Sequence, residues 1–438
     1  MTGELRFLWA RLNANYWFYP ALFTVLGAAL AFGLVYLDRN GFANWLSDIA
    51  WIVPARPKGA ADMLTVMAGS MIGVASTVFS ITIAAVAYAS GNYGPRLLTN
   101  FMEDRGNQLS LATFIGSFVY ALIVLRSVRT EDETAATIAD AAATTLPGFT
   151  PQLSLLVAYA LMAICVAVLV FFLNHIPSSI RINKVLEGIG GRLLESIRDT
   201  YPVEDKLREA RALEGGEPLT ALDTGYVQLI DFEDLAAIAR DANCTLSLRI
   251  RTGDFVHRDL PLLDVKGCDP EEIEDKVRAC FTLGATRTPE QDPQFLIDEL
   301  VEIGLRALSP GINDPFTAIT ALHWLGAATA EIGRRDLRKQ VCKDDAETCP
   351  VIPKPDDFRH YADRGFGTIR GGVATSPSAA EVMMETIENA ALPVQHSPRV
   401  KVLRDEADLL MAQARLSLKG PDLEIVERRY RTLCERMV

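Results

Sequence analysis

The chain has 438 residues, of which 49% are hydrophobic, and its formal net charge is -12 at pH 7. Only nine of the 43 basic and ten of the 55 acidic residues precede residue 181, so nearly all of the negative excess belongs to the rest of the chain. An acidic domain of this kind repels nucleic acid and anionic lipid. We therefore expect no nucleic-acid partner, while a small ion, a small ligand or a protein remains open as a partner.

Four long stretches near the N-terminus contain no Asp, Glu, Lys or Arg: 12–37, 63–95, 106–125 and 141–180. A helix needs about 20 mostly apolar residues to cross the hydrocarbon core of a bilayer. We therefore expect an α-helical domain embedded in the lipid bilayer over residues 1–176, with transmembrane helices near 17–37, 67–87, 109–125 and 153–173.

Four spans place both termini on the same side of the membrane. Basic residues near the ends of spans favour the cytoplasm, and the side that holds the termini would carry Arg6, Arg11, Arg96, Arg105, Arg181 and Lys184. The bias is modest, because the opposing loops hold Arg39, Arg56, Lys58, Arg126 and Arg129. We expect both termini, and the large domain after the fourth span, to be cytoplasmic.

The second span carries a strip of small residues at helical spacing, which consists of Gly69, Gly73, Ser76, Ser80, Ala84, Ala87 and Gly91. Small residues let helix backbones approach closely, so the first interpretation is a helix-packing face and self-association of the protein. The alternative is a face that lines a pore, because Ser70, Thr77, Thr82 and Ser90 add hydroxyl groups nearby.

The spans contain no acidic or basic side chain at membrane depth, and His175 falls at the end of the fourth span. Carriers coupled to protons or ions usually hold such a group inside the membrane. The sequence therefore disfavours a coupled transporter and leaves a passive channel open. The polar run from Tyr88 to Pro95 is expected to end or bend the second helix.

The composition of the rest of the chain is typical of a water-soluble protein. We expect a helical stalk and linker over 177–216, an α+β domain over 217–335 and a mostly helical C-terminal region over 336–438. The α+β domain follows from a β-α-β-β-α order, in which Asp231 and Asp269 cap the two helices. Lys419-Gly420-Pro421 separates two C-terminal helices, 400–416 and 422–437, which are expected to pack on the domain or on a second subunit.

A helix over 294–308 is expected to stop at the turn Ser309 to Pro315, because Pro310 and Gly311 end it and Asp314 caps the next helix. This structural explanation is sufficient by itself. The functional alternative is a ligand or partner contact formed by Arg306, Asn313 and Asp314, together with Arg287, Gln291 and Asp292.

No nucleotide-binding, metalloprotease or nucleophile-elbow spacing is present in the sequence, so we expect no enzyme, no catalytic residue and no cofactor. The weak candidates for a metal site are Asp356, Asp357, His360 and Asp363, although a solvated charged helix is the commoner explanation. Cys342 and Cys349 are close enough to close a small loop, but a reducing cytoplasm argues against a disulfide.

The run Arg306 to Ala318, Arg-Ala-Leu-Ser-Pro-Gly-Ile-Asn-Asp-Pro-Phe-Thr-Ala, resembles the hallmark of a bacterial family of predicted membrane proteins that is catalogued as a domain of unknown function. The resemblance extends to residues 78–82, 95–98 and 225–228, while Thr252 stands where the family pattern has Pro before Gly253. The resemblance implies a multi-pass inner-membrane protein with four spans and a soluble tail, and it implies no activity.

The leading functional hypothesis is a homo-oligomeric, channel-like membrane protein that is gated or assembled by its cytoplasmic domain. It depends on the small-residue strip of the second span and on a soluble domain too large for a simple anchor. The alternative is a membrane-anchored sensor or scaffold whose soluble domain binds a ligand or a protein partner.

Overall fold

The computed structural model describes residues 15–42, 55–93, 104–129, 148–179, 181–203, 215–338, 341, 349–394 and 397–437. It divides into two compact units, Met1–Arg181 and Ile182–Val438. Of the basic residues at the span ends, Arg6, Arg11 and Arg96 lie outside the described residues.

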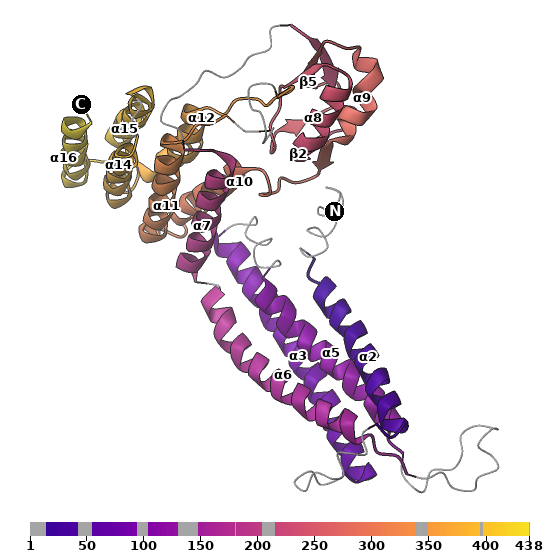
Figure 1. The fold of residues 1–438 in the computed structure, drawn as a ribbon. Coiled ribbons are helices and arrows are strands. Elements are labelled where there is room, and N and C mark those ends of the chain that lie inside the picture. Colours follow the sequence, from indigo (N-terminus) through magenta and orange to yellow (C-terminus); the bar gives the residue numbers. More distant parts are fainter. Residues whose placement is uncertain are drawn as a thin grey trace. The chain divides into compact units, whose positions relative to one another are not determined.

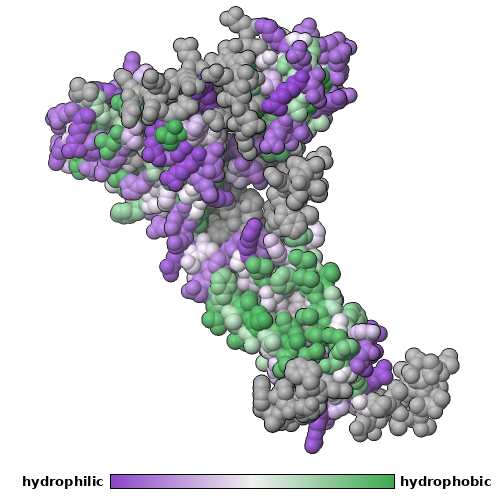
Figure 2. Space-filling model, in the orientation of Figure 1, coloured by the Kyte–Doolittle hydropathy of each residue, from purple (hydrophilic) through white to green (hydrophobic). Residues whose placement is uncertain are grey.

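The first unit contains four helices long and apolar enough to cross a membrane: α2 (Phe18–Arg39), α3 (Pro57–Tyr93), α5 (Arg105–Ser127) and α6 (Gln152–Ser179) (Figure 1). These four helices coincide in sequence with the four predicted spans. An apolar surface covers these helices in Figure 2, as lipid-facing side chains require. The 37 residues of α3 extend over about 55 Å, which exceeds the roughly 30 Å of the hydrocarbon core.

The helix α3 runs through most of the polar segment that was expected to end or bend it. The segment is helical as far as Tyr93, while Gly94 and Pro95 lie outside the described residues. Helical hydrogen bonds satisfy the backbone there, so the hydroxyl and amide side chains do not force an earlier end.

α5 is the central helix of this unit, because it packs against α2, α3 and α6. Phe114, Tyr120 and Val124 of α5 are completely or almost completely buried. Polar contacts fix both ends of the bundle. Asp38 accepts hydrogen bonds from the backbone N–H groups of Leu153 (3.0 Å) and Ser154 (2.9 Å), and so caps the start of α6.

The second unit begins with an α/β part made of two small sheets. One sheet has the strand order β1 (Glu217–Thr220), β5 (Pro261–Lys266), β3 (Thr245–Leu248), β7 (Val351–Ile352), and the other has the order β4 (Phe255–Val256), β2 (Gly225–Ile230), β6 (Phe281–Gly284). All pairings are antiparallel except that of β3 with β7. Val227, Leu235, Leu246, Leu263 and Val277 belong to its shared core.

The helices α8 (Phe232–Asp241) and α9 (Pro270–Ala279) of this part start where the sequence predicts. Asp231 accepts a hydrogen bond from the N–H of Asp234, and Asp269 accepts one from the N–H of Glu271. Strands β1, β6 and β7 were not predicted. β7 is two residues long and pairs with a strand about 100 residues earlier, so no local pattern marks it.

A helical bundle completes the unit: α7 (Ile182–Thr200), α10 (Pro293–Ala307), α11 (Pro315–Gly333), α12 (Phe358–Ala362), the π-helical turn η2 (Asp363–Gly367), α13 (Thr368–Val373), α14 (Pro377–Ala391), α15 (Ser397–Ser417) and α16 (Pro421–Arg436). This differs from the predicted boundaries. α10 and α11 were assigned to the α+β domain, and α7 was assigned to a separate stalk, but α7, α10 and α11 pack on one another, and α11 also packs on α14. The apolar faces of α7, α10 and α11 pack on other helices and not on a sheet.

The cysteines also depart from expectation at one position. Cys349 is disulfide-bonded, whereas Cys342, the other cysteine of the predicted loop, lies outside the described residues. The cysteines at 165, 244, 268, 280 and 434 are free. The disulfide at Cys349 differs from the expectation that a reducing cytoplasm keeps the cysteines of this segment free of a disulfide.

Candidate functional site

The small-residue strip of α3 faces away from the other described helices of the first unit. All seven of its members are exposed: Gly69, Gly73, Ser76, Ser80, Ala84, Ala87 and Gly91. A Cβ built on Gly69, Gly73 or Gly91 would meet no atom within 4 Å. The opposite face of α3 is the buried one, with Leu64, Met67, Met71, Ala75 and Val78 in the core of the unit. Among the described residues of the first unit, the strip is therefore not a packing face.

The hydroxyl groups on this exposed face bond to their own helix. Thr77 donates to the carbonyl oxygen of Gly73 at 3.0 Å, and Ser80 donates to that of Ser76 at 2.9 Å. Such bonds satisfy the donors without a neighbour and leave oxygen lone pairs facing outward. Thr82, which was considered as part of a pore, is instead buried and donates to the carbonyl oxygen of Val78.

The close helix contact within the membrane unit lies between α2 and α5. A Cβ on Gly27 would come within 2.5 Å of the carbonyl oxygen of Gly116, and a Cβ on Gly116 would come within 2.9 Å of that of Phe23. Only glycine at both positions allows the two backbones to approach so closely. The two glycines lie in different spans, so the sequence pattern within one helix did not reveal this contact.

The polar pair Asp104 and His175 joins α5 to α6 at one end of the spans. Asp104 caps α5 through the N–H of Gly106 (2.8 Å), and His175 Nε2 lies 2.8 Å from its Oδ2. A side chain at residue 106 would collide with His175, since a Cβ there lies 2.6 Å from Nε2. The position of His175 at the end of the fourth span agrees with its predicted location, and Asp104 as its partner was not predicted.

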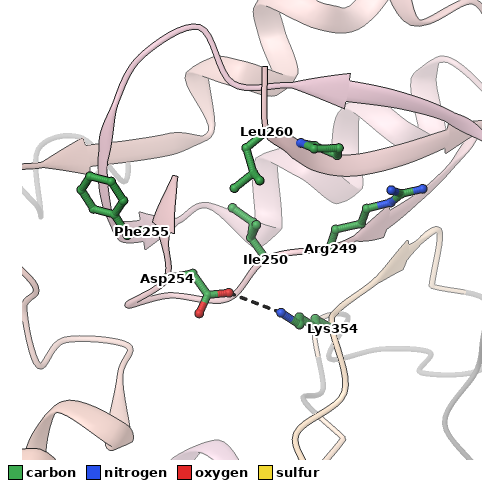
Figure 3. Close-up of a pocket in the computed structure, with 7 residues that line it drawn as sticks. Arg249, Ile250, Asp254, Phe255, Leu260 and Lys354 are labelled. Atoms are coloured by element: carbon green, nitrogen blue, oxygen red, sulfur yellow. Dashed lines mark hydrogen bonds and ion pairs between the residues drawn. The ribbon is translucent and has the colours of Figure 1, made fainter. Parts of the chain in front are cut away.

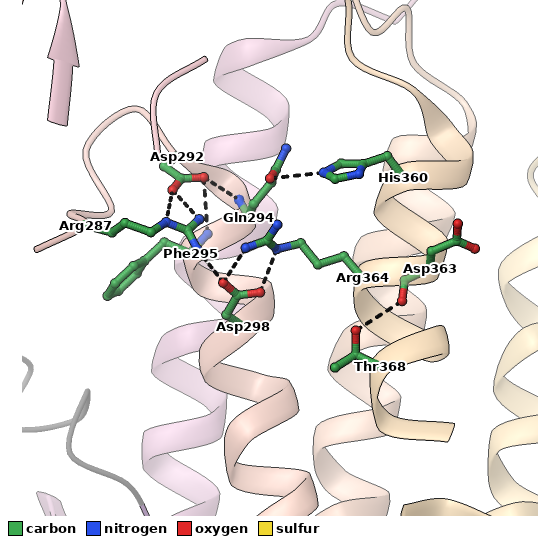
Figure 4. Close-up of polar contacts among 9 residues, drawn as sticks. All are labelled: Arg287, Asp292, Gln294, Phe295, Asp298, His360, Asp363, Arg364 and Thr368. Atoms are coloured by element: carbon green, nitrogen blue, oxygen red, sulfur yellow. Dashed lines mark hydrogen bonds and ion pairs between the residues drawn. The ribbon is translucent and has the colours of Figure 1, made fainter. Parts of the chain in front are cut away.

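In the second unit, Arg287 and Asp292 form part of a buried ionic network (Figure 4). Arg287 donates to Asp292 and to Asp298, and Arg364 donates to both oxygens of Asp298 at 2.6 Å. Burial raises the pKa of Asp292, and the neighbouring Arg287 opposes this effect. The carboxylate of Asp292 also caps α10 by accepting from the N–H groups of Gln294 and Phe295.

The network fixes the α/β part to the start of α10. A Cβ on Gly253, which has a φ of +89°, would lie 2.1 Å from Asp292 Oδ2, so the turn must have glycine there. Gln291 accepts from the N–H of Ile230 (3.1 Å) and donates to its carbonyl oxygen (3.2 Å). Each predicted contact residue here already has a structural partner within the chain.

The remaining predicted contact residues lie at the other end of α10. Asp314 caps α11 by accepting from the N–H and hydroxyl groups of Thr317 at 3.2 and 2.6 Å, and Asn313 has a φ of +50°. α10 has 15 residues and is about 22 Å long. The structure therefore separates Arg306, Asn313 and Asp314 from Arg287, Gln291 and Asp292, and the six do not form one site.

The four weak metal candidates do not converge. Asp356 accepts from the hydroxyl of Tyr201 and pairs with Arg251, Asp357 caps α12, and His360 Nε2 lies 3.2 Å from the side-chain oxygen of Gln294. Among the residues that the structure describes, no group of three or more His, Cys, Asp or Glu side chains is placed to hold a metal ion. Asp356 and Asp357 precede α12, so they do not share a helical face with His360.

An open pocket of about 380 Å³ lies on the α/β part (Figure 3). Its lining combines charged and apolar side chains: Arg249, Ile250, Asp254, Phe255, Leu260, Pro261 and Lys354. Lys354 Nζ lies 3.5 Å from Asp254 Oδ2. Sequence reasoning missed this pocket, because Lys354 reaches it from a segment about 100 residues after the others.

One family model matches the part of the sequence that forms the membrane helices, the α/β part and most of the bundle. The family is described as predicted membrane protein (DUF2254), and its sequence model matches residues 13–389 of this chain. The chain belongs to this family. Uncharacterized proteins of Mycobacterium bovis and Mycobacterium tuberculosis are each 29% identical to it over 373 residues, which is 82% of this chain and 69% of theirs. No solved structure matches the chain.

The match to the DUF2254 family covers all four spans, the α/β part and the bundle as far as α14. The hairpin of α15 and α16 lies beyond it. These two helices nevertheless pack on α14, and Glu388 of α14 pairs with Arg429 (2.7 Å) and Arg436 (2.8 Å) of α16. They complete the fold of this chain by covering α14.

Proposed function

We propose that this protein is a homo-oligomeric, passive channel of the bacterial inner membrane, in which the exposed strip of α3 faces the same helix of neighbouring copies and lines the pathway between them. The observation that carries the proposal is the exposure of all seven small residues on a helix whose other face is buried. A surface that faces lipid does not require small residues, because large apolar side chains contact lipid tails equally well.

Two features of the strip support a passive pathway. The span of α3 holds no charged side chain between Asp62 and Arg96, so it offers no site for a coupling ion. The outward-facing oxygen atoms of Ser76 and Ser80 are acceptors that could replace part of the hydration shell of a cation. Large neighbours such as Ile72 and Ile83 would close the sides of the pathway against lipid.

The test is ion flux through liposomes that contain the purified full chain. We expect flux in the parent protein and its reduction when Ser76 or Ser80 is changed to Phe, because a bulky ring fills the strip. The matched control is Val170→Phe on α6, a helix that carries no residue of the strip, where the parent side chain is 64% exposed. Liposomes without flux under every ion gradient and voltage tested would end the channel proposal.

Cross-linking tests the self-association separately from the flux. A cysteine at Ser80 should form a disulfide-linked dimer with its copy in the membrane, whereas a cysteine at Val170 should not. The parent protein with its native cysteines gives the baseline. A dimer at Ser80 without flux would keep the oligomer and reject the pore, and equal reaction at both positions would reject the strip as an interface.

The proposed location of the second unit is the cytoplasm, on the basis of the bias of arginine and lysine at the span ends. The disulfide at Cys349 is the opposing observation. Labelling of intact cells decides between them: a cysteine at exposed Lys419 should resist a membrane-impermeant maleimide until the cells are lysed. Labelling before lysis would place the unit outside and would make the disulfide expected.

The second candidate function is a membrane-anchored sensor or scaffold, and the pocket of the α/β part is the observation that favours it. Cationic Arg249 and Lys354 stand beside apolar Phe255 and Leu260, which suits a small anionic ligand with an apolar portion. Thermal-shift screening of the full chain against such compounds tests this function. A hit whose shift survives Lys354→Ala would not be bound in this pocket.

A further inference from the structure

The turn between α10 and α11 exposes apolar side chains in a fixed conformation. Phe316 is 77% exposed and Ile312 is 42% exposed. The turn is held by hydrogen bonds from the N–H of Asn313 to the carbonyl oxygen of Ser309 (2.9 Å) and from the N–H of Asp314 to that of Ala307 (2.8 Å). The exposure of these apolar groups is therefore built into the fold of the turn.

The register of α7 against α11 shows which end of the bundle carries this turn. Gly190 lies against the ring of Trp324, Arg198 pairs with Glu331, and Arg335 donates to the carbonyl oxygen of Tyr201. The offset is 133 or 134 residues in each case, so the two helices run in parallel. The same offset places Phe316 level with Ile182, the first residue of α7.

The start of α7 is tethered to the membrane by the chain itself. The last span, α6, ends at Ser179, and α7 begins at Ile182 after only two residues. The predicted fourth span ends at residue 173, six residues or about 9 Å of helix before Ser179, and packed helices lie about 8–10 Å apart. The chain connection therefore puts the end of the bundle that carries Phe316 next to the point where the chain leaves the membrane. Exposed Lys184 and Arg181 beside that point are residues typical of the headgroup region.

We propose that Ile312 and Phe316 insert into the headgroup and acyl boundary of the same bilayer that holds the spans, and so dock the second unit on the lipid surface. Aromatic and aliphatic side chains are favoured at this depth. The acidic charge of the unit does not support electrostatic attachment, so the contact is apolar in kind. A patch of two side chains is also small for a protein interface, which takes about 20–30 residues a side.

Photo-cross-linking in the reconstituted full chain tests this proposal. Benzoylphenylalanine replaces Phe316, an aromatic for an aromatic, and the liposomes contain phosphatidylcholine with a fraction of alkyne-tagged phosphatidylcholine. The matched control is the same residue at Leu392, which is 79% exposed. α14 runs parallel to α11, since Gly326 lies against Thr386 and Gly333 against Val394, so Leu392 lies at the opposite end of the bundle.

We expect about tenfold more tagged lipid on the chain cross-linked at residue 316 than at residue 392. The same reagent at Ile312 provides a second site. Equal labelling at 316 and 392, no lipid adduct at either turn position, or an adduct to a second copy of the chain would each overturn the proposal. A requirement for anionic lipid would overturn the apolar mode of contact.

Discussion

Glu331 near the end of α11 allows a quantitative test of how the bundle is held together. Its Oε1 accepts from Arg335 Nε (3.0 Å) and Arg198 Nε (3.3 Å), and its Oε2 pairs with Arg334. Burial acts to raise the pKa of Glu331, but the hydrogen bonds from Arg334 and Arg335 outweigh it and lower the pKa to about 2 from an ordinary 4.5. The carboxylate is therefore more stable as an anion in the folded protein.

This difference in pKa corresponds to about 3 kcal/mol of folding free energy. Because the folded pKa is the lower one, the contribution is complete above pH 4.5 and is lost as the pH falls toward 2. By pH 3 less than about half of it should remain. We expect Glu331→Gln to lower the free energy of unfolding by about 3 kcal/mol at pH 7, with the difference from the parent protein shrinking as the pH falls.

Urea unfolding of the full chain in detergent micelles, followed by far-UV circular dichroism, measures this change. Membrane helices resist urea in the micelle, so the transition belongs to the second unit. With an m value of about 3 kcal/mol/M, the midpoint should fall by about 1 M. The control is Glu187→Gln in the exposed pair with Lys184, which should cost less than about 0.5 kcal/mol. Equal midpoints for the parent and the Glu331 variant, or a difference constant between pH 7 and pH 3, would refute the reasoning.

Two further predictions concern the packing and the start of α11. Gly190→Ala should destabilise the bundle by about 1–3 kcal/mol in the same urea assay, because its Cβ would lie 2.2 Å from the ring of Trp324, while Gly191→Ala has open space and should be neutral or slightly stabilising. Equal midpoints for the two alanine variants would contradict the close approach of α7 and α11. Asp314→Ala should cost about 1 kcal/mol through the lost cap on Thr317, and Asp314→Asn should recover most of it. An alanine variant as stable as the asparagine variant would show that the cap contributes nothing.

Local patterns predicted the features that depend on local chemistry. The spans follow from runs without charge, and the starts of α8, α9 and α11 follow from Asp231, Asp269 and Asp314, because a capping carboxylate acts on N–H groups two or three residues away. The DUF2254 family was likewise indicated by a short run of residues, and the family match to residues 13–389 confirmed it.

The candidate sites were predicted less well, since they depend on distances that no local pattern contains. Arg306 lies in the last turn of α10, whereas Arg287 precedes the helix and contacts Asp292 and Asp298 at its start, which a list of polar residues does not show. Asp298 and Arg364 were missed, although they complete the ionic network, because they come from α10 and η2 and meet only in the folded unit. The same holds for Lys354 at the pocket.

The sequence by itself determined that the chain has four uncharged stretches long enough to cross a membrane and that α3 carries one face of small residues. Both are properties of composition and helical periodicity, which do not depend on what surrounds the helix. Only the tertiary structure decided where that face points. Gly27 and Gly116 provide the close contact inside the membrane unit, while the strip of α3 stays exposed, because the larger apolar side chains on the other face of α3 fill the core.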